Sequence, residues 1–266
     1  MPTEPSWPEW GAFPPPEKYF EKDYFTGMQG EMHAGEILDS VCGPDVERHH
    51  EQRTYEILRC HPCLAIHAWP LPSEEALARF YTERFYQQEK PDYVERYERD
   101  RPWWTACVHM PIIDTCARAL ALDSDTTQPR VLDIGAGPGI FLDCAKRQRN
   151  WDTTGIEPNT ALADALTSRG HRGWHGMLGE ERTTALWESV ATLQPHIVML
   201  YEVLEHQICP ETLLLNCHDI MADNGLLVVV VPNDYNPLQF AACAQHALLP
   251  YWLAPPQHLW YFTPKC

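Results

Sequence analysis

Residues 131–141 read VLDIGAGPGIF, and this stretch decides the expected fold of the chain. An apolar run is followed by three closely spaced glycines and then by the first residues of a helix-like segment. Glycine allows a tight turn and lets a ligand approach the backbone closely. In open α/β sheets, ligands bind beyond the carboxyl ends of the parallel strands, where this turn would lie. The stretch therefore predicts a strand, a ligand-binding turn and a helix, in that order.

The sequence on both sides of this turn alternates between strand-like and helix-like segments. We expect strands at residues 130–134, 152–156, 171–174, 196–201 and 226–231, and helices at residues 140–147, 160–168 and 211–221. Such alternation is typical of a parallel sheet with right-handed crossovers. The nearly continuous apolar character of the strands indicates burial on both faces of the sheet. The prediction is an α/β fold with a Rossmann-like parallel sheet.

Composition divides the 266 residues into three parts. Residues 1–72 mix prolines with aromatic residues and predict an irregular arm and a small N-terminal module. Residues 73–128 predict a helical linker or cap, which begins at the N-cap residue Ser73 with two glutamates in its first turn. The apolar face of this first cap helix comprises Leu77, Phe80, Tyr81 and Phe85. Residues 129–266 carry the alternating pattern and predict the ligand-binding domain.

Charge and hydropathy exclude several classes of partner. The chain has 37 acidic against 20 basic residues and a formal net charge of -17, which opposes binding to nucleic acid phosphates. Its longest strongly apolar run, residues 226–231, is too short to cross a bilayer, and its start lacks the pattern of a signal peptide. The ten cysteines are scattered, as in reduced intracellular proteins. We expect a soluble cytoplasmic protein without nucleic acid or membrane partners.

The glycine spacing discriminates between two kinds of nucleoside cofactor. A dinucleotide fingerprint requires G-x-G-x-x-G, but here the third glycine falls one place early and Ile140 occupies the last glycine position. Asp133 lies within the last two residues of the strand, and a carboxylate suits a ligand with sulfonium and ammonium charges better than a pyrophosphate. Glu157 ends the second strand, where a carboxylate can bind both ribose hydroxyls of either cofactor. The turn therefore favours a sulfonium cofactor over a nicotinamide dinucleotide.

Residues 130–263 resemble the class I S-adenosylmethionine-dependent methyltransferases, in the group that includes the ubiquinone-biosynthesis O-methyltransferases. The matching stretches are LDIGAGPG at residues 132–139, GIEP at 155–158, YEVLEH at 201–206, ADNGLL at 222–227 and PN at 232–233. The resemblance implies S-adenosylmethionine as cofactor and a small-molecule acceptor. Oxygen is the favoured methylated atom, and carbon and nitrogen are the alternatives. It also implies that Asp133, Gly135 and Gly137 line the methionine part, Glu157 binds ribose, Met177 and Leu178 flank adenine, and Tyr201 and Glu202 face the methyl group.

A cluster of acidic residues and histidines follows the fourth expected strand. Glu202, Glu205 and His206 are spaced i, i+3 and i+4, so a helical turn would point them the same way. His258 lies in PPQHLWYF at residues 255–262, which resembles the histidine-bearing loop after the fifth strand in this family. The four side chains could hold a divalent metal, and Glu205, His206 and His258 could instead supply a general base without metal. In a third interpretation the cluster only shapes the pocket.

Three other functions remain open beside small-molecule O-methylation. Similar Glu-x-x-Glu-His clusters are metal ligands in small-RNA 3′-end methyltransferases, so 2′-O-methylation of small RNA is one alternative, which the acidic composition opposes. A non-catalytic binding subunit with a methyltransferase fold is the second. A NAD-dependent oxidoreductase is the third, and the glycine spacing opposes it.

Three cysteines in the N-terminal module resemble the ligands of a zinc ribbon. Cys60 and Cys63 form one pair, and Cys42 stands alone because Asp39 occupies the place of its partner. Either zinc is bound with Asp39 or a histidine as fourth ligand, or the ribbon is degenerate and its thiols are free.

The end of the chain departs from the family pattern. Class I sheets normally continue after the fifth strand with a helix and an antiparallel strand pair, and the chain leaves no room for them before Cys266. An uncovered apolar edge strand at residues 226–231 would invite pairing or aggregation. We therefore expect the N-terminal arm, a second copy of the chain or a further C-terminal part to cover this edge.

Overall fold

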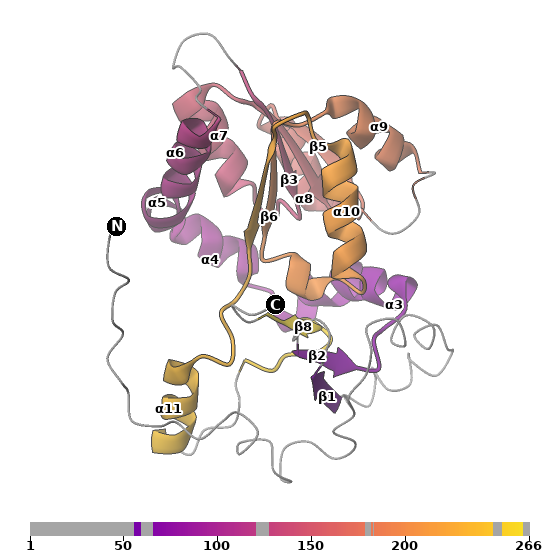
Figure 1. Ribbon diagram of the computed structural model, residues 1–266, viewed down its shortest axis with the longest axis vertical. Coiled ribbons are helices and arrows are strands. Elements are labelled where there is room, and N and C mark those ends of the chain that lie inside the picture. Colours follow the sequence, from indigo (N-terminus) through magenta and orange to yellow (C-terminus); the bar gives the residue numbers. More distant parts are fainter. Residues whose placement is uncertain are drawn as a thin grey trace, which may run out of the picture.

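The computed structural model describes residues 56–59, 66–120, 128–178, 182, 184–246 and 252–262. At its centre lies a parallel sheet of five strands in the order β5-β4-β3-β6-β7 (Figure 1). Its strands are β3 (Arg130–Ile134), β4 (Asp152–Glu157), β5 (Arg172–His175), β6 (Ile197–Tyr201) and β7 (Leu226–Val230). Strand order reverses between β3 and β6, and ligands of such sheets bind at that point. The predicted α/β fold with a Rossmann-like sheet is confirmed.

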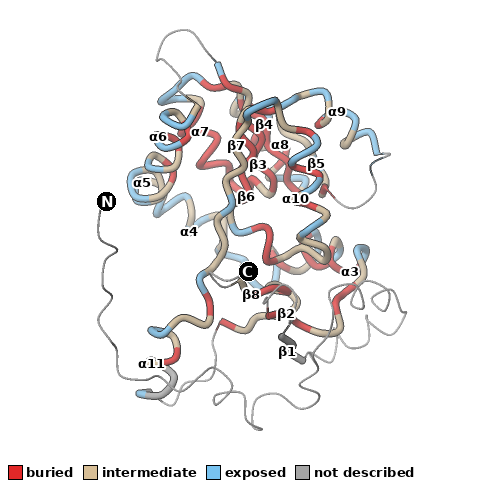
Figure 2. Tube along the Cα trace, in the orientation of Figure 1, coloured by how far each residue is buried: buried red, intermediate tan, exposed pale blue. Residues whose placement is uncertain are grey.

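Helices cover both faces of the sheet because its strands are apolar on both sides (Figures 1 and 2). Val131 and Met199 pack on the face covered by α6 (Met110–Ala119), α7 (Ile140–Arg149) and α8 (Thr160–Ser168). Leu132 and Leu200, one residue further along each strand, pack on the opposite face against α9 (Ala185–Leu193) and α10 (Pro210–Ile220). This alternation follows from the two-residue period of a strand.

One glycine allows α8 to lie close to the edge strand β5. A Cβ atom on Gly173 would lie 2.4 Å from the Ala163 carbonyl oxygen and 2.7 Å from Thr167 Oγ1. Replacing Gly173 with alanine should lower the free energy of unfolding by about 1–3 kcal/mol, because the backbone of α8 must shift. Thermal melting checks this, since each kcal/mol shifts Tm by about 2–4 °C in a chain of this size. Ser189→Ala on the exposed side of α9 is the control, and an equal melting temperature for both variants would contradict the packing argument.

A helical cap leads into the sheet from the N-terminal side. It comprises α3 (Glu74–Arg79), the π-helix η2 (Phe80–Glu89), α4 (Tyr93–Arg99), α5 (Arg101–Trp104), the π-helix η3 (Thr105–His109) and α6. Ser73 caps α3 as predicted, because its hydroxyl accepts a hydrogen bond from the Ala76 amide at 3.2 Å. The predicted apolar face is buried, and it packs against Leu71, Leu259 and Trp260.

A second, antiparallel sheet joins segments that are far apart in the sequence. Its order is β1 (Glu56–Arg59), β2 (Ile66–Trp69) and β8 (Trp260–Tyr261), with Ile66 opposite Tyr261. The intervening helix α11 (Pro237–His246) packs its Phe240 against Trp252 and Tyr261. The last described strand therefore pairs with a strand from the part predicted as the N-terminal module.

Two surface features bear on the predicted partners. Among the described residues no strand pairs with the outer edge of β7, and Val229 on that strand is 38% exposed. Cover of this edge by another segment or a second copy stays a prediction. No helix in the described part of the chain combines the length and the apolar character that crossing a bilayer requires.

Candidate active site

The turn after β3 depends on glycines at two close contacts. Gly135 and Gly139 have φ angles of +72° and +67°, which side chains rarely adopt. A Cβ atom on Gly135 would lie 2.6 Å from Val203, and one on Gly139 would lie 2.3 Å from Leu166. The amides of Gly135 and Ala136 donate to the Ile156 carbonyl oxygen at 2.8 and 3.0 Å, which ties the turn to β4.

Glu157 ends β4 and is buried beside this turn. Its Oε2 accepts a hydrogen bond from the Gly137 amide at 2.8 Å, and its Oε1 accepts one from the Asn159 amide at 2.9 Å. The Tyr86 hydroxyl of η2 also donates to Oε1 at 3.3 Å. Burial raises the pKa of Glu157 to about 7, although these hydrogen bonds favour the charged form. The carboxylate that the sequence assigned to ribose therefore also holds the turn in place.

A second buried carboxyl group belongs to Asp133 at the end of β3. Burial and the nearby charge of Glu157 raise the pKa of Asp133 to about 8. Two buried carboxyl groups favour a cationic ligand over a diphosphate, because a cation stabilises their charged forms and a diphosphate repels them. The residues at this turn therefore fit a sulfonium cofactor.

These pKa values predict how cofactor affinity depends on pH. In the free protein Glu157 is mainly protonated below its pKa of about 7, and Asp133 is mainly protonated below its pKa of about 8. A cationic ligand favours both carboxylates, so binding should release protons, and Kd for S-adenosylmethionine should fall between pH 6 and pH 8.5. The effect is at most about tenfold per pH unit for each group. Calorimetry in buffers of different ionisation enthalpy measures the proton release, and proton uptake or a pH-independent Kd would contradict this assignment.

A cavity lies between the carboxyl edge of the sheet and the cap. Of the residues predicted to bind the cofactor, Gly135, Gly137, Glu157, Met177, Leu178, Tyr201 and Glu202 line it, and Asp133 lies buried at the end of β3. From the cap, Tyr81, Phe85, Tyr86 and Tyr93 close it. A larger cavity of about 380 Å³ adjoins it and shares Met177 and Leu178. That volume is within the range of ligand pockets.

The structure brings three of the four predicted metal or catalytic residues together. One ligand atom each of Glu205, His206 and His258 lies within 4.8 Å of the others. Glu205 and His206 stand on the short 3₁₀-helix η4 (Leu204–His206) after β6. Glu202 does not join them, because its left-handed φ of +53° breaks the helical turn that the spacing presumed. Burial raises the pKa of Glu202, and the nearby Tyr97 of the cap partly offsets this rise.

Hydrogen bonds between two distant loops bring His258 to this cluster. The Leu259 amide donates to the Glu205 carbonyl oxygen at 2.8 Å, and the Trp260 indole donates to the Gln207 carbonyl oxygen at 2.8 Å. The Gln257 carbonyl oxygen accepts a hydrogen bond from His206 Nδ1. Residues 257–260 are thus held against η4.

The cluster contains buried polar atoms that have no hydrogen-bond partner among the described residues. Because His206 donates through Nδ1, its Nε2 is an acceptor, and it lies 3.6 Å from Glu205 Oε1. Neither Glu205 carboxyl oxygen, nor His258 Nδ1, has a hydrogen-bond partner in another described residue. Burial raises the pKa of Glu205 to about 8 and lowers that of His206 to about 4. Burial and the neighbouring His206 lower the pKa of His258 to about 3.

Sequence reasoning missed the cap residues that close the cavity. Tyr81 and Phe85 were predicted only as an apolar helix face, and nothing in the local sequence distinguishes Tyr86 from a surface tyrosine. The three predicted zinc ligands Cys42, Cys60 and Cys63 lie outside the described residues.

Comparison with known proteins assigns the chain to a family. A methyltransferase domain family matches residues 107–265, which is more than half of the chain. A search of curated proteins found no match.

Several solved structures resemble the chain at low sequence identity. A SAM-dependent methyltransferase from Archaeoglobus fulgidus is 19% identical over 59% of this chain and 63% of its own, with a TM-score of 0.39. The plantazolicin methyltransferase BpumL, in complex with SAH, is 14% identical over 79% of this chain and 66% of its own, with a TM-score of 0.47. DesVI from Streptomyces venezuelae is 15% identical over 54% of this chain and 57% of its own, with a TM-score of 0.41. The chain spans less than two thirds of the length of each of these structures.

The family match decides the assignment. It includes every strand of the parallel sheet and the glycine turn between β3 and α7. The narrower resemblances to the ubiquinone-biosynthesis group and to a zinc ribbon stay predictions. Because the match covers more than half of the chain and the whole parallel sheet, the chain belongs to the class I S-adenosylmethionine-dependent methyltransferases.

Proposed function

We propose that this methyltransferase transfers the methyl group of S-adenosylmethionine to a hydroxyl oxygen of a small molecule. The observation that supports this is the convergence of Glu205, His206 and His258 beside the cavity that Tyr201 lines. A hydroxyl group is a weak nucleophile until a base or a metal removes its proton. An amine acceptor is already nucleophilic when neutral, so it has less need of such a cluster.

The proposed reaction requires the chain to position its substrates and to accept one proton. S-Adenosylmethionine supplies a methyl group already activated by the sulfonium, so in-line positioning and exclusion of water provide most of the rate. The acceptor oxygen forms a bond to the methyl carbon while the bond from sulfur breaks, and S-adenosylhomocysteine leaves. The hydroxyl proton passes to the cluster, of which the His206 side chain lines the cavity.

We further propose that Glu205, His206 and His258 hold a divalent cation. Buried polar atoms without hydrogen-bond partners are unfavourable, and a cation held by one atom of each side chain would stabilise the cluster. Two imidazoles with one carboxylate suit Zn²⁺, Mn²⁺ or Fe²⁺ better than Mg²⁺. Three protein ligands also leave a coordination position open, as in catalytic metal sites. Such a cation would lower the pKa of an acceptor hydroxyl.

Ligand titration tests the proposed function directly. Calorimetry should show binding of S-adenosylmethionine and S-adenosylhomocysteine and no binding of NAD⁺. Incubation with donor labelled in its methyl group and a fractionated small-molecule extract should then yield labelled products whose methyl ethers resist mild base. Binding of NAD⁺ in place of both sulfur ligands would overturn the proposal.

The alternatives predict other outcomes of the same experiments. Label that enters short RNA instead of small molecules would support 2′-O-methylation, which the net charge of -17 opposes. Donor binding without any labelled product, in small molecules or RNA, would support a non-catalytic binding subunit.

A further inference from the structure

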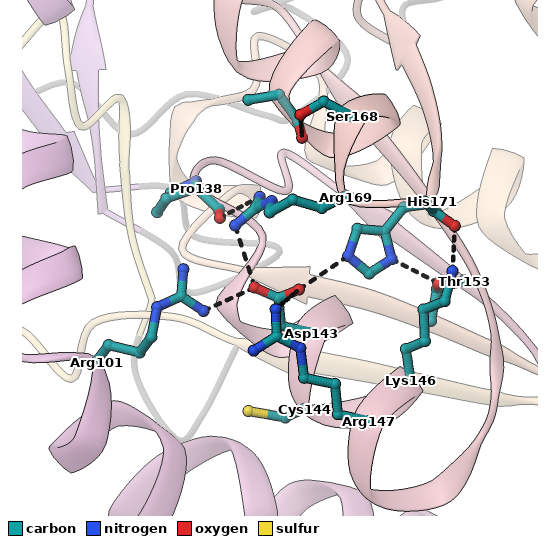
Figure 3. A network of polar contacts seen from close by, with 12 residues as sticks. Arg101, Pro138, Asp143, Cys144, Lys146, Arg147, Thr153, Ser168, Arg169 and His171 are labelled. Carbon is teal, nitrogen blue, oxygen red and sulfur yellow. Dashed lines mark hydrogen bonds and ion pairs between the residues drawn. The ribbon is translucent and has the colours of Figure 1, made fainter.

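A buried ionic network lies behind the glycine turn (Figure 3). Asp143 in the first turn of α7 is its centre and is buried. Its carboxylate accepts hydrogen bonds from Arg101 Nη1 at 2.8 Å and Arg169 Nη1 at 3.1 Å. His171 Nε2 lies 3.2 Å from its other oxygen. None of these four residues lines either cavity, so the mechanism proposed above makes no use of them.

The network carries a fixed negative charge at its centre. Burial would raise the pKa of Asp143, but the hydrogen bond with His171, the charge of Arg169 and the hydrogen bond from Arg101 lower it to about 2. His171 is itself held in place, because its Nδ1 lies 2.7 Å from the Thr153 hydroxyl on β4. Charge-assisted hydrogen bonds of this kind are stronger and more directional than neutral ones.

Arg169 connects this network to the turn. It follows the last residue of α8, and its Nη2 donates to the Pro138 carbonyl oxygen at 2.6 Å. The Arg169 guanidinium also packs against Gly139, since a Cβ atom on Gly139 would lie 2.7 Å from Nη2. One arginine therefore sets the position of the peptide between Pro138 and Gly139, while Asp143 fixes the arginine.

Arg101 connects the same network to the cap. It begins α5, and besides Asp143 it bonds Glu98 of α4, with Nε at 2.7 Å from the carboxylate. Tyr93 of α4 lines the cavity that the glycine turn and Glu157 also line. The cap and the turn thus meet at one carboxylate, although each contributes to the cavity from a different side.

We propose that Asp143 couples the cap to the glycine turn through Arg101 and Arg169. The position of the cap against the turn then determines the affinity for S-adenosylmethionine. The three residues are positioning residues, because they act through the turn and do not touch the donor. The proposal rests on the proposed function for its donor, but the geometry of the turn can be measured without any ligand.

A set of arginine variants tests the coupling. Arg169→Met should raise Kd for S-adenosylhomocysteine about tenfold, which corresponds to loss of one charge-assisted hydrogen bond. Arg101→Met should raise it about threefold, and the double variant should show less than the product of the two effects because both act through Asp143. Arg169→Lys should restore part of the affinity, since lysine can reach either Asp143 or Pro138 but not both. Hydrogen exchange of residues 131–141 without ligand should be faster in both single variants.

The matched control is Arg172→Met at the start of β5. Arg172 donates hydrogen bonds to Asp152 and Thr154. It lies at the amino ends of the strands, and the glycine turn lies at their carboxyl ends. This variant should lower Tm but leave Kd within twofold of wild type and leave exchange in the turn unchanged. Independent effects of Arg101→Met and Arg169→Met on Kd, or unchanged exchange in the turn with Arg101→Met, would overturn the coupling. A wild-type protein that binds no sulfur ligand would overturn the proposed function instead, and the exchange measurement would still decide the coupling.

Discussion

Replacing Glu157 with glutamine should weaken binding of S-adenosylmethionine by a factor of about 10²–10⁴. The buried carboxylate accepts hydrogen bonds from the Gly137 and Asn159 amides, and it is the group proposed to bind the ribose hydroxyls. Glutamine has the same shape, but its NH₂ group would face one of these amide donors. Each charge-assisted hydrogen bond is worth about 1.5–3 kcal/mol, and at least two would be lost or weakened.

Calorimetric titration with S-adenosylhomocysteine measures this effect without an acceptor. Glu188→Gln on the exposed side of α9 is the matched control, and its affinity should equal that of wild type. Thermal melting of Glu157→Gln without ligand separates loss of binding from loss of fold. An affinity within threefold of wild type would show that Glu157 does not bind the cofactor.

Replacing Glu205 with glutamine should lower kcat by about 10²–10⁴, the range for loss of a group that transfers or activates a proton. The KM for S-adenosylmethionine should change little, because Glu205 is 1% exposed and does not line either cavity. In the wild-type protein Zn²⁺ or Mn²⁺ should raise Tm, and Glu205→Gln should abolish that rise. His218→Ala is the control, since the His218 side chain is 85% exposed.

The pH profile separates a metal site from a base without metal. If Glu205 is the base, kcat/KM should rise with pH and level off near the Glu205 pKa of about 8, because only the carboxylate accepts a proton. A bound cation favours the carboxylate, so with metal that rise should move to lower pH and a chelator should abolish activity. Unchanged kcat in Glu205→Gln would exclude both roles.

The sequence predicted the sheet well because its strands carry local signals. Residues 130–134 and 160–168 were predicted with the bounds that the structure has, since apolar runs and helical periodicity are properties of neighbouring residues. The helix at Ala185–Leu193 and the strand at Trp260–Tyr261 were missed. The strand has two residues and exists only because β2, nearly 200 residues earlier, supplies its partner.

Sequence reasoning located the cavity-lining residues that belong to a local motif. Gly135, Gly137 and Glu157 lie at strand ends and were placed by their position in the pattern. The geometry of Glu202 was not predictable, because the i, i+3, i+4 rule presumes an α-helix. The Glu202 backbone instead has a left-handed conformation, with a φ of +53°. Tyr86 was missed because it reaches Glu157 across 71 positions from a π-helix, whose wider turn alters which residues share a face.

The pairing of β2 with β8 has a consequence for engineering. His258 lies close to Glu205. Two residues further along the chain, β8 (Trp260–Tyr261) pairs with β2 (Ile66–Trp69), and this pairing holds the segment in place. A graft of the Rossmann-like half onto a foreign cap would release this histidine and would also replace the cap residues that close the cavity. Chimeras between relatives should therefore exchange residues 66–69 and residues 257–262 together, because the two segments pair with each other.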